Sequence, residues 1–224
     1  MISIEVDFHM SDEEPKKYAL ILANLDYILV DPSERKLQTY LEIGWDETNA
    51  RAYVGNPKNW DQIASFNTPY VTFSASSRRN RFYEIFWKDD YFAYDQLYPG
   101  AGEILNDLVQ RFNVIVLTSR TEDMKEKTLA RLEEIGVPVA DIEFNFKGTL
   151  DPLPRFKAES IKNAAEKYQM GLALVHQPTD IDLCRKYSLT LIGLTTTNSR
   201  EEFYKADAVC ADWVQIVAVL NTVQ

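Results

Sequence analysis

Tyr18-Ala-Leu-Ile-Leu-Ala-Asn24-Leu-Asp26-Tyr-Ile-Leu-Val30-Asp31 is the stretch of this sequence that decides the fold. Residues 18–23 form a nearly continuous apolar run, which is typical of a strand covered on both faces of a parallel sheet. Two polar residues, Asn24 and Asp26, follow that run. Because ligands of open α/β sheets bind at the carboxyl ends of the strands, we expect both side chains to lie in a functional site.

The rest of the sequence, from Pro99 onward, alternates strand-like and helix-like patterns. Short apolar runs are separated by segments with apolar residues at helical spacing. This alternation predicts an α/β fold with a doubly wound parallel sheet. The predicted strands are 114–117, 142–146, 172–175, 190–195 and 208–210, and the predicted helices are 100–112, 124–135, 156–168, 181–187 and a closing helix. Residues 2–8 alternate apolar and polar side chains and predict an added edge strand.

Residues 31–97 separate the first predicted core strand from the others. This stretch is too long for a simple connection, so we expect it to form a small inserted unit. The expected domains are therefore a core of residues 1–30 and 98–224 and an insertion of residues 31–97. Three arginines between 78 and 81 precede an aromatic series, a combination that can bind a phosphate or a base. The helical spacing of Phe82, Ile85 and Phe86 instead favours packing against the core.

Composition narrows the classes of partner. The 224 residues carry a formal net charge of −10, with 34 acidic and 24 basic side chains. Such a charge opposes binding to nucleic acids and anionic membranes, and no apolar run approaches the roughly 18 residues of a membrane span. The N-terminal segment has charges within its apolar run and no basic flank, unlike a signal peptide. We expect a soluble, cytoplasmic protein, with Cys184 and Cys210 as buried free thiols.

Four segments resemble, in order, the motifs of the haloacid dehalogenase-like phosphatase superfamily. The first is the opening stretch, where the family has Asp-x-Asp-Gly-Thr and its leading aspartate attacks phosphorus. The others are Val114-Ile-Val-Leu-Thr-Ser-Arg120, Arg155-Phe-Lys-Ala-Glu-Ser160 and Ala173-Leu-Val-His-Gln-Pro-Thr-Asp-Ile-Asp-Leu183. The resemblance implies a Rossmann-like core with a small cap inserted after the first core strand. By position it assigns Asn24 to the nucleophile, Asp26 to the general acid, Thr118 and Lys157 to phosphate binding, and Asp180 to the metal.

The sequence departs from this pattern at the first and fourth motifs. Asn24 replaces the nucleophilic aspartate, and a neutral carboxamide is a poor nucleophile and a weak magnesium ligand. Tyr27 and Ile28 stand in place of Gly-Thr, and Val175-His176 stands in place of the metal-binding Gly-Asp. Two carboxylates that would hold magnesium are therefore missing. These departures indicate a degenerate member of the superfamily that lacks the nucleophile.

Several remaining residues have two interpretations. Asp26 is either the general acid or a turn carboxylate. Asp180 and Asp182 are the remaining candidates for a magnesium site, and His176 with them would suit zinc or manganese, although a histidine that simply fills the vacated site is the alternative. Lys157 either attracts anions or is a solvated lysine in the first turn of a helix, with Lys147 and Lys162 as substitutes.

Three functions follow from these patterns. The first is binding, regulation or assembly without phosphatase activity, through a pocket for a small phosphorylated ligand lined by Asn24, Asp26, Thr118 and Lys157. The second is an active magnesium-dependent phosphatase that uses displaced residues, with Asp26, Asp31, Asp180 and Asp182 as candidates. The third is a structural or interaction domain that binds a protein partner or a second copy of itself through its aromatic insertion.

Overall fold

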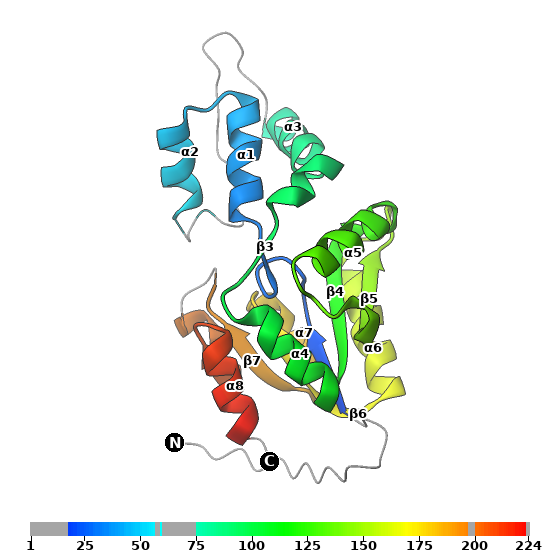
Figure 1. Ribbon diagram of the computed structural model, residues 1–224. Helices are drawn as coiled ribbons and strands as arrows, with labels where there is room; N and C mark the ends of the chain where they lie inside the picture. Colours follow the sequence, from blue (N-terminus) through cyan, green and yellow to red (C-terminus); the bar gives the residue numbers. More distant parts are fainter. Residues whose placement is uncertain (1–17, 57–58, 60–74, 197–199, 223–224) are drawn as a thin grey trace.

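A six-stranded parallel sheet forms the core of the protein in the computed structural model, which describes residues 18–56, 59, 75–196 and 200–222 (Figure 1). The strand order is β5-β4-β1-β6-β7-β8, and every neighbouring pair runs parallel. The strands are β1 (Tyr18–Leu22), β4 (Asn113–Thr121), β5 (Ile142–Lys147), β6 (Gln169–Val175), β7 (Thr190–Leu194) and β8 (Ala208–Cys210). The predicted edge strand at 2–8 lies outside the described residues.

Helices cover both faces of this sheet, as the alternating sequence pattern predicts. Leu20 and Leu22 of β1 belong to one apolar cluster, whereas Ala19 and Ile21 belong to another on the opposite face. Helices α4 (Ala101–Arg111), α5 (Lys125–Glu134) and α8 (Trp213–Thr222) contribute to the first cluster, and α6 (Leu153–Lys167) and α7 (Thr179–Arg185) to the second. The doubly wound α/β fold is therefore confirmed.

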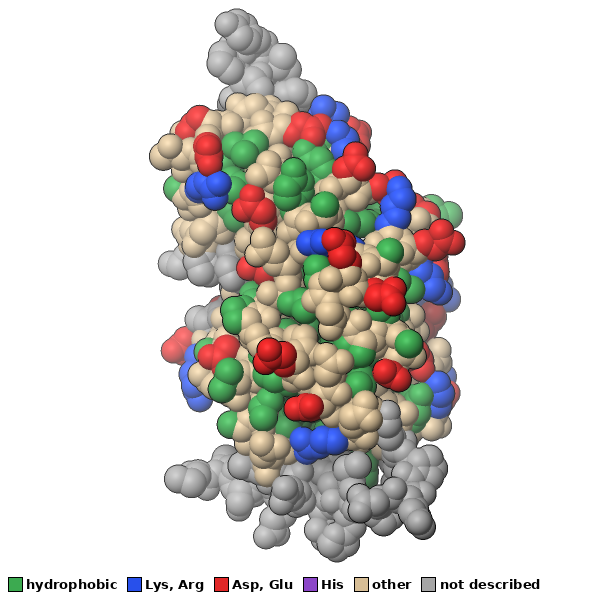
Figure 2. All heavy atoms as spheres, viewed as in Figure 1, with side chains coloured by type: hydrophobic (Ala, Val, Ile, Leu, Met, Phe, Trp, Pro, Cys, Tyr) green, Lys and Arg blue, Asp and Glu red, His purple; other side chains and the backbone are tan. Residues whose placement is uncertain are grey.

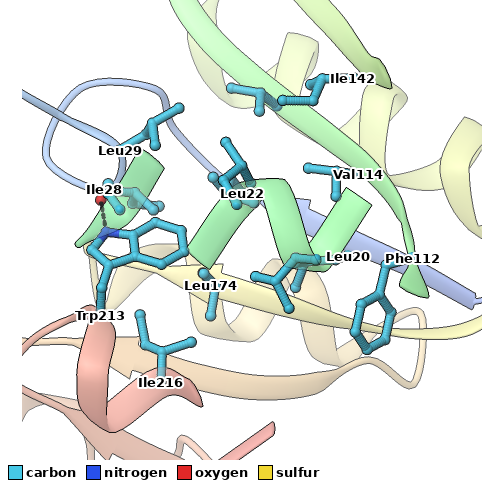
Figure 3. Close-up of a cluster of buried hydrophobic side chains, with 14 of the residues drawn as sticks. Leu20, Leu22, Ile28, Leu29, Phe112, Val114, Ile142, Leu174, Trp213 and Ile216 are labelled. Atoms are coloured by element: carbon cyan, nitrogen blue, oxygen red, sulfur yellow. Dashed lines mark hydrogen bonds between the residues drawn. The ribbon is translucent and has the colours of Figure 1, made fainter. Parts of the chain in front are cut away.

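Trp213 anchors the loop that follows β1. Its indole is 1% exposed and packs among the apolar side chains of the first cluster, and its Nε1 donates a hydrogen bond to the carbonyl of Ile28 at 2.8 Å (Figure 3). The hydroxyl of Thr196 donates to the neighbouring carbonyl of Tyr27, also at 2.8 Å. These two contacts fix the backbone immediately after Asp26.

A second layer of helices lies over one end of the core sheet (Figure 1). Helices α1 (Ser33–Ile43), α2 (Glu47–Val54) and α3 (Ala75–Phe86) make up this layer, which we call the cap. Two short antiparallel strands, β2 (Val30–Asp31) and β3 (Gln96–Leu97), carry the chain out of the core and back. Phe82, Ile85 and Phe86 are buried, but Phe82 and Phe86 pack within the cap rather than against the core as predicted. The cap cluster consists of Leu37, Tyr40, Ala50, Val54, Phe82 and Phe86.

Short 3₁₀ helices complete the described chain: η2 (Asp89–Tyr94), η3 (Glu122–Met124), η4 (Val139–Asp141) and η5 (Arg200–Phe203). Acidic side chains are spread over both cap and core on the face seen in Figure 2, consistent with the net charge of −10. Among the described residues, no helix is both long and apolar enough to cross a membrane. Cys184 and Cys210 are buried free thiols, as predicted.

Candidate functional site

A cavity of ≈ 340 Å³ lies between the cap and the core, at the carboxyl ends of β1, β4 and β6. Its volume falls within the range of small-molecule binding sites. Its location is the one that the sheet topology favours for a ligand. The core contributes Asn24, Asp26, Tyr27, Ser119, Leu153, His176 and Gln177 to the lining, and the cap contributes Lys36, Arg79, Phe82, Tyr83, Phe86 and Trp87.

Asn24 presents a neutral amide to this cavity. The residue is 9% exposed, and its Oδ1 is buried without a hydrogen-bond partner among the described residues. Leaving a buried polar atom unpaired costs about 1–3 kcal/mol, so such an atom needs an explanation. The side chain lines the cavity, where an incoming ligand can satisfy it.

Asp26 belongs to a buried network of two carboxylates and two arginines that joins core to cap. Its Oδ1 lies 2.6 Å from Nη2 of Arg35 in α1 and 2.8 Å from Nη2 of Arg120 in β4. Asp95, just before β3, lies 3.3 Å from Nε of Arg35 and 2.7 Å from Nη2 of Arg120. None of the four residues is more than 4% exposed. The network thus holds two negative and two positive charges away from water.

This network keeps Asp26 ionised. Burial alone would raise the pKa of its carboxyl, but the charges and hydrogen bonds of Arg120 and Arg35 outweigh burial and lower that pKa to about 2. Both arginines also make cation–π contacts with aromatic rings. Cζ of Arg35 lies 4.2 Å from the ring centroid of Phe86, and Cζ of Arg120 lies 4.8 Å from that of Phe92. A carboxylate held in this way accepts hydrogen bonds but has no proton to donate near neutral pH.

Tyr27 occupies the position where the resembled motif has glycine. Its backbone conformation is one that favours glycine at this position. Its φ angle is 70°, in the left-handed region that L-residues other than glycine enter at a cost of roughly 1–2 kcal/mol. The turn persists because Tyr27 N–H donates to the carbonyl of Val30 at 2.8 Å and its own carbonyl is bonded by Thr196. Its ring stacks on His176, with ring centroids 5.5 Å apart.

His176 follows β6 at the place of the missing metal ligand. Its side chain is fully buried, and burial, together with the Lys157 cation, lowers its pKa to about 3. The imidazole is therefore neutral at physiological pH. A neutral, stacked ring fits the interpretation that His176 fills the vacated site.

We expect the imidazole of His176 not to titrate between about pH 5 and pH 8 in two-dimensional NMR spectra, because the folded environment disfavours its cation. A His176→Gln variant assigns the resonance. In urea, where burial is lost, the same imidazole should titrate near its ordinary pKa of about 6.5. A midpoint between pH 5 and pH 8 in the folded protein would contradict this account.

Lys157 and Asp180 form a second buried pair, with 2.7 Å between Nζ and Oδ2. Lys157 is 4% exposed, so the interpretation of it as a solvated lysine is wrong. Burial raises the pKa of Asp180, although Lys157 partly opposes that shift. Asp182 points elsewhere: its side chain is 68% exposed and bonded to Lys205 at 2.9 Å. The structure does not bring Asp180 and Asp182 together.

The residues present do not fit a magnesium ion. Magnesium needs oxygen ligands that can turn toward it, with carboxylates foremost. Here both oxygens of Asp26 are held by arginines, one oxygen of Asp180 is bonded to Lys157, and Asn24 offers only an amide. Within the described ranges, no three His, Cys, Asp or Glu side chains are grouped so as to hold a metal.

The strand that carries Thr118 continues further than its sequence pattern predicts, to Thr121. Thr118 is 1% exposed, and its hydroxyl accepts the N–H of Arg120 at 3.1 Å. The next residue, Ser119, lines the cavity instead. Of the residues assigned by resemblance, the structure therefore places Asn24 and Asp26 in the cavity lining, and Lys157 in its own ion pair.

The solved structures of other proteins show what this architecture is. A phosphatase candidate from Clostridium difficile is 18% identical, with a TM-score of 0.66 over 93% of this chain and 100% of its own. The chain has the haloacid dehalogenase-like hydrolase fold. A hydrolase of that family from Streptococcus pneumoniae is 15% identical, with a TM-score of 0.62 over 92% of this chain and 99% of its own. CbbY from Rhodobacter sphaeroides, solved in complex with phosphate, is 14% identical, with a TM-score of 0.54 over 90% of this chain and 96% of its own.

At such identities the likeness shows the haloacid dehalogenase-like fold and not an activity. No protein-family model matches the sequence, and no curated protein matches it either. The chemistry therefore has to be argued from the side chains of this chain.

Proposed function

We propose that this protein binds a small anionic ligand, of the phosphate-ester class, between cap and core without a metal ion and without hydrolysing it. The observation that carries the proposal is the neutral amide of Asn24, which lines the cavity at the position where the resembled phosphatases have their nucleophile. The Nδ2–H groups of this amide can donate to phosphate oxygens, and its unpaired Oδ1 can accept from a ligand hydroxyl. An amide is too weak a nucleophile to attack the phosphate group.

The charges around the cavity favour an anion. Among the described residues, its charged lining consists of Asp26, Lys36 and Arg79. Asp26 and Asp95 together balance Arg35 and Arg120, which makes this network neutral. Nζ of Lys36 already donates to the carbonyl of Asn59 at 2.8 Å, so Arg79 is the cation of the lining that we assign to the anion, in a protein whose net charge is −10. With no carboxylate at position 24, no metal ion is needed to offset repulsion between the site and a phosphate.

The other site residues also support binding over turnover. Asp26 is in the position of the general acid, yet its two arginine partners keep it deprotonated. His176 is a neutral ring rather than a metal-binding carboxylate. One structural neighbour, CbbY, was solved with phosphate bound, which supports phosphate as the chemistry of this cavity. The biological role of such a protein would be regulatory or in assembly.

The test is thermal unfolding with inorganic phosphate, in EDTA and then with added magnesium. At a phosphate concentration one hundred times the dissociation constant, we expect Tm to rise by about 5–10 °C in both conditions. Asn24→Asp should weaken phosphate binding in EDTA by at least about tenfold, because like charges then face each other. Asn106→Asp makes the same charge change on an exposed face of α4 and should leave binding unchanged.

Hydrolysis of phosphate esters is measured in parallel, with and without magnesium. We expect no turnover by the unmodified protein. Magnesium-dependent turnover by the unmodified protein would overturn the proposal and favour a phosphatase with displaced residues. Absence of any phosphate effect on Tm would overturn it in favour of a structural or interaction domain.

A further inference from the structure

One face of α3 supplies most of the cap side of the cavity. Arg79, Tyr83 and Phe86 follow one another at helical spacing, and all three line the cavity. The ring of Phe86 already has partners within the protein: it stacks on Phe82, and the guanidinium of Arg35 lies over it. Tyr83 is 37% exposed, and Cζ of Arg79 lies 5.8 Å from its ring centroid. Tyr83 and Arg79 therefore form a ring and a cation that a ligand can reach.

The core side offers a second flat surface. The half-buried Tyr27 lines the cavity, and its ring stacks on the fully buried His176 behind it, with an angle of 26° between their planes. Tyr27 adopts its left-handed backbone conformation with a bulky aromatic side chain, where glycine would be free of strain. Residues in such conformations persist at binding sites when the surroundings hold them in place. Aromatic surfaces thus approach the cavity from both cap and core.

Polar groups complete the lining between these two surfaces. Asn24, Ser119 and Gln177 offer neutral donors and acceptors, and Arg79 offers a charge that forms strong hydrogen bonds with phosphate. Phosphate alone would leave the aromatic rings unused. A flat ring alone would leave Arg79 and the amide of Asn24 unused. The lining therefore matches a ligand that has both features.

We infer that the ligand of this cavity is a phosphate monoester of a planar aromatic group, with its ring against Tyr83 and Tyr27 and its phosphate toward Arg79 and Asn24. This inference rests on the proposed function and adds the class of ligand to it. Stacking of a ring on a protein aromatic side chain strengthens binding by about tenfold or more. The aromatic phosphate should therefore bind more tightly, by that factor, than a non-aromatic phosphate ester of equal charge.

The test is a calorimetric titration of the full chain in EDTA with phenyl phosphate, adenosine monophosphate, ribose 5-phosphate and inorganic phosphate. We expect the two aromatic phosphates to bind about tenfold more tightly than ribose 5-phosphate. Tyr83→Ala should remove that advantage while leaving the affinity for inorganic phosphate unchanged, and Tyr83→Phe should retain it. Arg79→Met should weaken the binding of all four probes. Tyr94→Ala is the matched control, because Tyr94 is also 37% exposed and is outside the cavity lining.

The outcomes separate this inference from the proposed function. If all four probes bind equally, or if Tyr83→Ala weakens inorganic phosphate as much as phenyl phosphate, the aromatic ligand class is wrong and the anion site stands. If none of the four binds, the proposed function fails and the inference fails with it. A tenfold preference that survives Tyr83→Ala would also overturn the role assigned to that ring.

Discussion

Replacing Asp26 with alanine is expected to lower the free energy of unfolding by about 3–5 kcal/mol, the cost of breaking a buried ion pair from one side. The change leaves Arg35 and Arg120 buried with only Asp95 to balance them. Neither guanidinium can reach water, because both residues are 0% exposed. Urea unfolding followed by circular dichroism at neutral pH measures the loss.

Two comparisons show whether charge balance is the cause. Asp182→Ala breaks an exposed ion pair with Lys205 and should leave the urea midpoint unchanged. The double variant Asp26→Ala with Arg120→Met leaves the matched pair Arg35–Asp95 and should be less destabilised than the sum of its single changes. Stability of Asp26→Ala equal to that of the unmodified protein would show that the network contributes nothing.

The effect of Asp26 should also depend on pH in one direction. Its folded pKa of about 2 lies below the ordinary value of 3.8, so the ionised form is favoured by folding. The stability it contributes is fully present above about pH 4 and is lost as the pH falls through about 2. The difference between the unmodified protein and Asp26→Ala should therefore narrow as the pH falls through that range.

The network gives Asp26 a role different from the acid catalysis that its motif position implies by resemblance. Arg35 comes from the first cap helix and Asp95 from the end of the insertion, whereas Asp26 and Arg120 come from the core. The four side chains thus tie both ends of the cap to the carboxyl edge of the sheet. A carboxylate committed to two arginines supports a protein that holds a ligand between cap and core rather than one that transfers protons to it.

Most of the fold could be predicted from the sequence, because helices and strands leave patterns among residues that are close together in the chain. Periodic apolar residues set β1 and the helices that follow it, and this pattern depends on neighbours a few positions apart. The network could not be predicted in this way, since Asp26 and Arg120 are 94 residues apart in sequence. Only the positions of Arg35 and Asp95, close to either end of the insertion, offered a signal.

The candidate site was predicted in part for a similar reason. Asn24 and Asp26 line the cavity because they directly follow a buried strand. Thr118 matches its motif by position, yet Ser119 lines the cavity in its place. Neighbouring residues of a strand point to opposite faces, so only one of the two side chains can face the cavity. The cap wall around Tyr83 depends on how α3 packs over the core, which a single sequence does not specify.

Trp213→Ala is the second substitution with a large expected effect. The indole is buried in the core cluster, and removing such a side chain costs about 3–5 kcal/mol (Figure 3). The change also leaves the carbonyl of Ile28 without its donor. Because that carbonyl follows Asp26 and the strained Tyr27, we expect weaker phosphate binding as well as lower stability. Urea unfolding and phosphate titration in EDTA measure the two effects.

Trp213→Phe separates packing from the hydrogen bond. It keeps a buried ring but removes the Nε1 donor, so the expected loss is smaller, about 1–3 kcal/mol for the unpaired carbonyl and the reduced volume. If the indole hydrogen bond holds the loop in its left-handed turn, both variants should weaken phosphate binding, although they differ in stability. Full phosphate affinity in Trp213→Phe would mean that the bonds of Tyr27 to Val30 and Thr196 are sufficient to hold the turn, and that Trp213 acts through packing alone.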